Sequence, residues 1–348
     1  MRALILHGPG RLSLEEVPRP RAGAGEIVLR VHAATICGTD VRILDGTKTR
    51  DVRPGHPIGH ECAGTIAEIG PEVRGFREGE AVSVCVVVSC GRCASCAMDR
   101  ENLCANRSTL GYHTDGCFAE YMRIPAAAVE RGNLFRLPDA VPLEVAPLLE
   151  PTGCCINGWH EMAVGQDEAG HRGRESLVIF GAGPIGLIHL MLARAGGVTP
   201  QRVGFVTVVE PLPHRREAAR RFGADEAVDF EGFDVRDRFD SAILAVGRTE
   251  LIEAAMRAVR DCGRISLFAG FDRGASATID PNAIHYRQLR LTGGSESRRR
   301  DYRQALDMAA AGRLNLAPLI THRFPIERYE EAFDAAANRR GLKVALML

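Results

Sequence analysis

A glycine-rich turn between an apolar strand and a helix is the feature that most constrains how this chain can fold. The run Leu177–Phe180 is continuously apolar, which is typical of a parallel strand buried on both faces. It leads directly into Gly181-Ala182-Gly183-Pro184-Ile185-Gly186, and a helical run, 187–195, follows. Between a buried strand and a helix, this G-x-G-x-x-G pattern predicts a dinucleotide-binding loop.

Each glycine of the loop has a separate purpose in that prediction. Gly181 makes the tight turn, Gly183 lets the backbone approach a pyrophosphate, and Gly186 lets the helix pack closely on the strand. The start of the helix supplies N–H donors and a positive dipole to the phosphates. We therefore expect the whole loop, Pro184 and Ile185 included, to contact the cofactor.

An acidic residue closes the next predicted strand. The apolar run 204–209 ends at Glu210, near where an acid binds the adenine ribose hydroxyls in this kind of fold. A carboxylate there repels a 2′-phosphate, so the sequence favours NAD over NADP. Arg215 and Arg216 follow closely after Glu210 in the sequence and weaken the preference for NAD. We count Arg215 among the cofactor-binding residues.

The two halves of the chain differ in pattern. Strand-like and helix-like runs alternate through 153–292, which predicts a doubly wound parallel sheet. Residues 1–152 instead carry short apolar runs separated by Pro and Gly, which predicts antiparallel strands. Residues 293–348 are too few for a domain and are expected to rejoin the first part. The expected fold is α/β, with a discontinuous β-rich domain, 1–152 and 293–348, and a parallel-sheet domain, 153–292.

Four cysteines follow a C-x2-C-x2-C-x7-C pattern: Cys90, Cys93, Cys96 and Cys104. The short steps let the four sulfurs converge on one tetrahedral ion, and four thiolates leave no position for a substrate. This pattern predicts a structural metal site. An iron–sulfur cluster could use the same four ligands.

A second set of donors is spread over the first 150 residues. Cys37, the pair His60-Glu61 and Glu150 offer one thiolate, one imidazole and two carboxylates, a set that suits zinc with a position left for water or substrate. Glu150 stands among apolar residues, where an acid is paired, neutralised or bound to a cation. Taken singly, Cys37 is better explained by a buried turn, and His60 by a strand edge.

Composition excludes several classes of function. The 348 residues include 44 basic and 44 acidic side chains, and this balance argues against a general nucleic-acid binder. No apolar stretch approaches the length of a membrane span, and the N-terminus lacks a signal-peptide pattern. We expect a cytoplasmic protein, in which the eleven cysteines serve as metal ligands or thiols rather than disulfides. The run Arg298–Arg300 is expected to be a solvated helix start.

Together these motifs resemble the zinc-dependent medium-chain dehydrogenase/reductase family, which includes alcohol, sorbitol and threonine dehydrogenases. The resemblance covers essentially the whole chain and implies a GroES-like catalytic domain around a Rossmann domain, with the active site in the cleft between them. It implies a catalytic zinc held by Cys37, His60 and Glu150, with Glu61 as an exchangeable ligand or held beside the metal. It also favours a structural zinc over an iron–sulfur cluster, and Thr39 as the acceptor of the substrate proton.

The acid at Glu150, followed by Pro151, is similar to the polyol and threonine dehydrogenase branch, although Cys154 or Cys155 could replace it as a ligand. The expected function is hydride transfer between a secondary alcohol (a polyol, sugar alcohol or cyclitol) and NAD(P). The alternatives are an L-threonine, amino-alcohol or aminocyclitol dehydrogenase. A protein of another class, which binds zinc and nucleotide without catalysis, stays open. A small-molecule substrate and a homodimer or homotetramer are implied.

One position departs from the family pattern. Relatives often carry a histidine five residues after the zinc-binding cysteine, where it passes a proton onward, and this chain has Arg42. A guanidinium cannot accept a proton near neutral pH. The relay is therefore expected to end at water, to use another group or to be absent.

Overall fold

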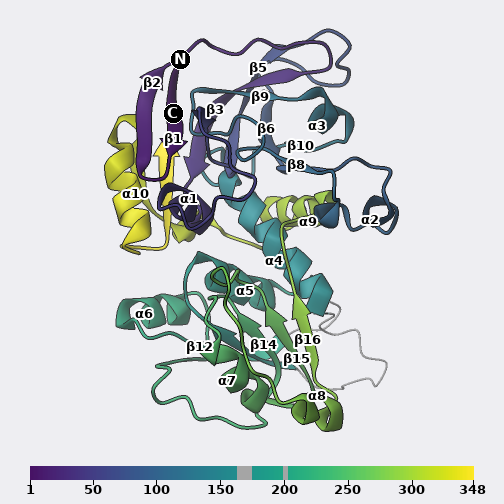
Figure 1. Ribbon diagram of the computed structural model, residues 1–348, viewed down its shortest axis with the longest axis vertical. Helices are drawn as coiled ribbons and strands as arrows, with labels where there is room; N and C mark the ends of the chain where they lie inside the picture. Colours follow the sequence, from purple (N-terminus) through teal and green to yellow (C-terminus); the bar gives the residue numbers. More distant parts are fainter. Residues whose placement is uncertain (163–174, 199–202) are drawn as a thin grey trace. The chain divides into compact units, whose positions relative to one another are not determined.

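The polypeptide divides into two compact units. Figure 1 shows the computed structural model, which describes residues 1–162, 175–198 and 203–348. The first unit comprises Met1–Gly153 and Glu296–Leu348, and the second comprises Cys154–Ser295. The domain limits at 152/153 and 292/293 stay a prediction. Within the described ranges, no helix has the length and apolar character needed to cross a membrane.

The first unit is built on a mainly antiparallel sheet of seven strands. Its order is β10-β6-β5-β3-β18-β17, and β9 also pairs with β3. The strands are β3 (Ile27–Thr35), β5 (Cys62–Ile69), β6 (Ala81–Val84), β9 (Tyr121–Ile124), β10 (Leu134–Arg136), β17 (Ile320–Pro325) and β18 (Lys343–Met347). The pairing of β18 with β3, in which Ala345 faces Thr35, brings the end of the chain into the sheet of its first part.

Smaller elements surround this sheet. A three-stranded sheet combines β1 (Arg2–Gly8), β2 (Arg11–Glu16) and β4 (His56–Pro57), and a short pair joins β7 (Val87–Val88) to β8 (Ser108–Thr109). The helices are α1 (Gly38–Leu44), α2 (Ala94–Ala97), α3 (Ala126–Glu130), α9 (Arg299–Ala310) and α10 (Tyr329–Ala337). Single 3-10 turns are η1 (Glu101–Leu103), η2 (Ala146–Leu148), η3 (Ala317–Leu319) and η4 (Ile326–Arg328). The apolar core runs along β3 and β5, with Leu29, Ile66 and Phe118 fully buried.

The second unit is a parallel sheet of six strands with helices packed against it (Figure 1). The strands are β11 (Glu175–Phe180), β12 (Val203–Val209), β13 (Glu226–Val228), β14 (Phe239–Leu244), β15 (Val259–Leu267) and β16 (Arg290–Gly293). Helices α5 (Pro184–Ala195) and α6 (Pro213–Arg221) contact β11–β13, whereas α7 (Glu250–Ala258) and α8 (Pro281–Arg287) contact β14 and β15. Helix α4 (Leu149–Met162) contains the boundary between the two units.

The strand order β13-β12-β11-β14-β15-β16 is that of a Rossmann fold. The direction of winding reverses at β11, and in such sheets a ligand binds beyond the carboxyl end of the strand at that reversal. The predicted glycine loop follows β11 directly. The predicted α/β architecture, with a GroES-like sheet domain and a Rossmann domain, is therefore confirmed.

The arginine run begins helix α9 as expected, but the expectation that the run is solvated was wrong for Arg298. Arg298 is buried and its Nε lies 2.6 Å from the buried carboxylate of Asp301. Arg299 pairs with Glu101, and Arg300 pairs with Asp99. The sequence suggests a solvated run because Glu101 and Asp99, the acidic partners of Arg299 and Arg300, lie about 200 positions away in the chain.

Candidate functional site

Three of the predicted zinc ligands meet in the first unit. One donor atom each from Cys37, His60 and Glu61 lies within 4.8 Å of the other two. Cys37 immediately precedes α1, while His60 and Glu61 immediately precede β5. Strand β5 pairs with β3, which leads into Cys37, so the sheet brings the two segments together. A thiolate, an imidazole and a carboxylate at this spacing fit a zinc ion.

Asp40 orients two members of this cluster. Its Oδ1 lies 3.2 Å from Nδ1 of His60, and its Oδ2 accepts a hydrogen bond of 2.8 Å from the backbone N–H of Cys37. Asp40 and His60 are both buried. Histidines that bind metals commonly direct their other ring nitrogen at a carboxylate. This arrangement leaves Nε2 of His60 for a metal and supports the fit to zinc.

Glu61 has two partners besides its neighbours in the cluster. The ammonium of Lys343, on β18, lies 2.7 Å from Oε1 and 2.6 Å from Oε2, and the hydroxyl of Thr35 donates to Oε2. Burial alone would lower the pKa of Lys343, but the charges of Glu61, Cys37 and Glu150 and the hydrogen bond to Glu61 together outweigh burial and raise that pKa above its ordinary value. The carboxylate of Glu61 is therefore neutralised from the side of the sheet.

Glu150 lies in the same neighbourhood without joining the cluster. Within the described ranges, the donor atoms that lie within 4.8 Å of one another do not include its carboxylate. Glu150 is buried in the first turn of α4, and its charge acts on both Tyr112 and Lys343. Its assignment as the third zinc ligand stays a prediction.

Thr39 and Arg42 lie on α1, beside Cys37. The guanidinium of Arg42 donates a long hydrogen bond of 3.5 Å to Oγ1 of Thr39. Because a guanidinium only donates, this contact occupies a lone pair of the hydroxyl and leaves its proton to point elsewhere. The roles of Thr39 and Arg42 in proton transfer stay predictions.

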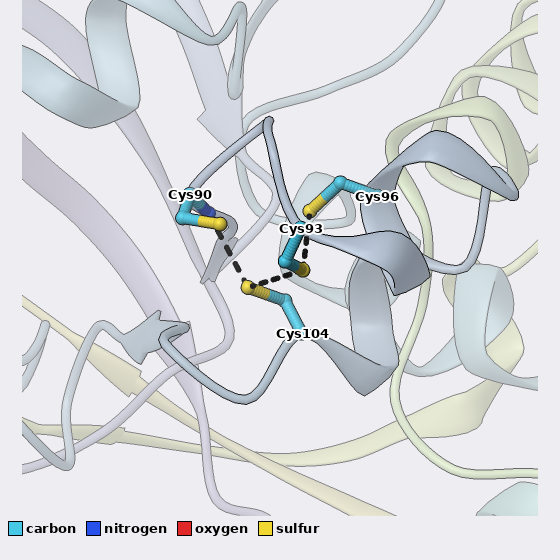
Figure 2. A group of neighbouring side chains, drawn as sticks. All are labelled: Cys90, Cys93, Cys96 and Cys104. Carbon is cyan, nitrogen blue, oxygen red and sulfur yellow. Dashed lines mark hydrogen bonds between the residues drawn. The ribbon is translucent and has the colours of Figure 1, made fainter.

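The four predicted structural ligands converge on one point (Figure 2). Their sulfurs lie within 4.8 Å of one another, with 3.5 Å between Cys93 and Cys96 and 3.7 Å between Cys93 and Cys104. Backbone N–H groups of Arg92 and Cys93 stabilise the thiolate of Cys90 and lower its pKa to about 6. A closed set of four thiolates fits a structural zinc.

Charged side chains fasten this cysteine lobe to the rest of the first unit. The guanidinium of Arg299, at the start of α9, donates at 2.8 Å and 2.6 Å to Oε2 of Glu101. The guanidinium of Arg131 donates to the carbonyl of Cys90 at 3.1 Å. Glu101 is buried, and the lobe is therefore held by ionic contacts as well as by a metal.

The glycine loop of the second unit has the geometry that the pattern predicts. Gly181 has a φ of 103°, which side-chain-bearing residues rarely adopt. A Cβ on Gly186 would lie 1.9 Å from the carbonyl oxygen of Gly181, so only glycine lets α5 approach β11 this closely. A Cβ on Gly183 would have a single neighbour within 4 Å, the guanidinium of Arg215 at 3.7 Å. This open cradle at the start of α5 fits a pyrophosphate.

Glu210 and the arginines after it surround this loop. Oε2 of Glu210 accepts from the backbone N–H of Ala182 at 2.8 Å, and Oε1 accepts from that of Leu212 at 3.0 Å. Arg216 donates to the carbonyl of Glu210 at 2.7 Å and pairs with Asp229. The buried Arg215 alone extends toward Gly183. The predicted cofactor residues are thus brought together, and their contacts with a cofactor stay predictions.

Comparisons with known proteins cover the whole chain. The family model described as alcohol dehydrogenase GroES-like domain matches residues 23–138, and that described as glucose dehydrogenase C-terminus matches residues 143–348. The L-threonine 3-dehydrogenase of Pyrococcus horikoshii is 34% identical over 100% of this chain and 99% of its own length. The chain belongs to the medium-chain dehydrogenase/reductase family.

Solved structures of this dehydrogenase family agree. An alcohol dehydrogenase of E. coli CFT073, solved with NADH, is 28% identical with a TM-score of 0.87 and covers 100% of this chain and 99% of its own. A putative zinc-binding dehydrogenase of Sinorhizobium meliloti 1021, bound to NADP, is 27% identical with the same score and coverage. The chain is an NAD(P)-dependent dehydrogenase that acts on a CH–OH group, and its cofactors are zinc and a nicotinamide nucleotide.

Several residues around the candidate active site of this dehydrogenase were not predicted from the sequence. Asp40 carries one local signal, because an acid at the third position of a helix is a helix-capping signal. Lys343 and Thr35 lie in apolar strands far from Glu61 in sequence. Only the sheet pairing of β18, β3 and β5 reveals them.

Proposed function

We propose that this dehydrogenase oxidises the secondary hydroxyl of a 2-amino-3-hydroxy acid such as L-threonine, with zinc and NAD. The observation that carries the proposal is the full-length likeness to L-threonine 3-dehydrogenases: 34% identity to that of Pyrococcus horikoshii and 30% to that of Bacillus licheniformis. The sequence alone had favoured polyols, with amino alcohols as the alternative. The relatives support the alternative better.

The buried donor cluster supports a catalytic centre rather than a binding protein without activity. Cys37 and His60, with Glu150 as the predicted third ligand, would hold a zinc ion. When bound, zinc supplies Lewis-acid polarisation of the substrate oxygen, and the nicotinamide supplies the hydride acceptor. Asp40 holds the imidazole of His60, and Lys343 neutralises Glu61, so this carboxylate would stay beside a bound metal.

Thr39 is the proposed acceptor of the substrate proton. Its hydroxyl is held by Arg42, a donor that cannot take the proton further. In this chain the proton therefore passes from Thr39 to water or to the cofactor ribose rather than to a side chain at position 42. Glu210 supports NAD, because its buried carboxylate beside the glycine loop repels a 2′-phosphate.

A substrate screen tests the proposal. Initial rates are measured with L-threonine, sorbitol, myo-inositol and an aminocyclitol, each with NAD and with NADP. We expect the highest kcat/KM for L-threonine with NAD, and loss of turnover with retained NAD binding in Cys37→Ala. A higher kcat/KM for a polyol would reject the amino-acid substrate. No turnover of any alcohol would favour the protein without catalysis.

Metal content and assembly complete the proposal. Two clusters of donors predict about two zinc ions per chain by elemental analysis. We infer from the family that the chain forms a homodimer or homotetramer, and light scattering on the purified protein measures this. A single zinc per chain would restrict the metal to one of the two clusters.

A further inference from the structure

A lysine ammonium lies one aromatic ring away from the candidate metal centre. Nζ of Lys48 lies 4.9 Å from the ring centroid of Tyr112, and that ring lies 5.1 Å from the imidazole of His60. A cation at this distance from a tyrosine face is attracted by the ring. Burial raises the pKa of Tyr112 above its ordinary value, so the phenol stays neutral beside the cluster.

Lys48 is attached to the helix that carries the cluster. Its backbone N–H donates to the carbonyl of Arg42 at 2.8 Å, at the end of the helix α1 that begins beside Cys37. The ammonium itself contacts only a carbonyl, that of Arg50 at 3.4 Å, together with the tyrosine ring. Within 1–162, 175–198 and 203–348, no carboxylate lies within salt-bridge distance of it.

The acidic groups whose charges act on Lys48 are Glu296 and Asp51, and both are already engaged with other cations. Oε2 of Glu296 lies 3.0 Å from Nε of Arg107. Oδ2 of Asp51 lies 3.5 Å from Nε of Arg50. Lys48 is half-buried, and the loss of water lowers its pKa from the ordinary lysine value. A partly desolvated ammonium without an ion-pair partner gains strongly from an anionic ligand.

We propose that Lys48 binds the carboxylate of the substrate while the substrate hydroxyl lies at the cluster of Cys37 and His60. Lys48 then selects 2-amino-3-hydroxy acids against polyols, because an uncharged substrate leaves the ammonium unpaired. The assignment deepens the proposed function and rests on it. Its basis is a half-buried ammonium without an ion-pair partner in the described ranges, 4.9 Å from the ring of Tyr112, which itself lies 5.1 Å from the imidazole of His60.

The kinetic test compares two alcohols that differ by one group. 1-Amino-2-propanol keeps the hydroxyl and ammonium of L-threonine and lacks its carboxylate. Lys48→Met keeps the length of the side chain and removes the charge. We expect Lys48→Met to raise KM for L-threonine about 10- to 100-fold, which is the usual range for a lost charged hydrogen bond. KM for 1-amino-2-propanol should stay within about twofold of the wild-type value. Lys48→Arg should restore most of the affinity.

Arg50→Met is the matched control. Arg50 lies on the same segment, but its side chain is 90% exposed and it pairs with Asp51. Arg50→Met changes the net charge of the segment by the same amount as Lys48→Met. It should leave KM for both substrates within about twofold of the wild-type value. Equal effects of the two substitutions on L-threonine would reduce the role of Lys48 to general electrostatics and overturn the assignment.

Calorimetry separates this assignment from the proposed function. L-2-Aminobutyrate carries the ammonium and carboxylate but no hydroxyl, so it binds without being oxidised. Its Kd for the NAD complex should rise in Lys48→Met by the same factor as KM for L-threonine. Failure of the wild-type protein to oxidise L-threonine would reject the proposed function. An unchanged Kd in Lys48→Met, or no binding to the wild-type protein, would reject the role of Lys48.

Discussion

The ammonium of Lys343 lies 2.6 Å from Oε2 of Glu61, and both side chains are buried. The two residues are 282 positions apart, one on the last strand and the other directly before β5. A buried carboxylate is costly unless a cation and hydrogen bonds compensate it, and Lys343 and Thr35 provide these. The last strand therefore completes both the sheet and the charge balance of the candidate active site.

Lys343→Met is expected to destabilise the protein strongly. It leaves the carboxylate of Glu61 buried without its counter-ion, a change that typically costs about 3–5 kcal/mol. For a unit of this size, that corresponds to a fall in Tm of roughly 10 °C by calorimetry. The double variant Lys343→Met with Glu61→Gln removes both charges and should recover part of the loss. A Tm that is unchanged in the single variant would show that the pair contributes little.

Cys93→Ser is expected to remove the structural metal. Loss of one thiolate opens the closed set of four, so zinc content should fall by about one ion per chain and Tm should drop. Elemental analysis and calorimetry measure the two effects. Cys262→Ser is the control, because Cys262 is exposed on β15 and lies outside both donor clusters. The four-thiolate site is wrong if zinc content stays at the wild-type level in Cys93→Ser.

Glu210→Gln is expected to shift the cofactor preference toward NADP. The amide keeps an acceptor for the N–H of Ala182 but loses the charge that repels a 2′-phosphate. We expect the ratio of kcat/KM for NADP to that for NAD to rise about tenfold, the effect of about 1.4 kcal/mol. Glu217→Gln on α6, with 60% of its side chain exposed, should leave the ratio unchanged. A shift of equal size in both variants would assign the effect to net charge.

His189 is expected to make the stability of the second unit depend on pH. It is buried on α5, with its ring 4.5 Å from that of Phe268, and burial lowers its pKa to about 3. In the unfolded chain the imidazole of His189 is protonated below about pH 6.5, whereas in the folded chain it stays neutral down to about pH 3. This contribution to stability is therefore complete above pH 6.5 and declines by about 1.4 kcal/mol per pH unit as pH falls toward 3.

Urea unfolding between pH 7 and pH 4 measures this slope. His189→Leu should flatten it, since leucine has no proton to gain on unfolding. The same substitution at His214, an exposed residue of α6, should keep the wild-type slope. Identical slopes in the wild-type protein and His189→Leu would remove His189 as the cause.

Local sequence patterns predicted those parts of the site whose geometry is set by residues close to one another in the sequence. The loop Gly181–Gly186 could be recognised because its turn and its close helix packing each require glycine. The cysteine lobe could be recognised because short, regular steps along the chain place four sulfurs around one point. The run Arg298–Arg300 was misjudged for the opposite reason, since the acids that bind Arg299 and Arg300 are distant in sequence.

The sequence by itself determined the family and the two kinds of domain, because the glycine loop and the cysteine lobe follow from residue types at fixed local spacing. Cys37 and His60 were predicted as zinc donors from the resemblance to that family. Only the tertiary structure decided what surrounds them. Lys343 contacts Glu61 because β18 pairs with β3, and the ring of Tyr112 lies near both Lys48 and His60. Contacts of this kind join side chains from separate segments, so no periodicity in the chain records them, and burial then gives them their energetic weight.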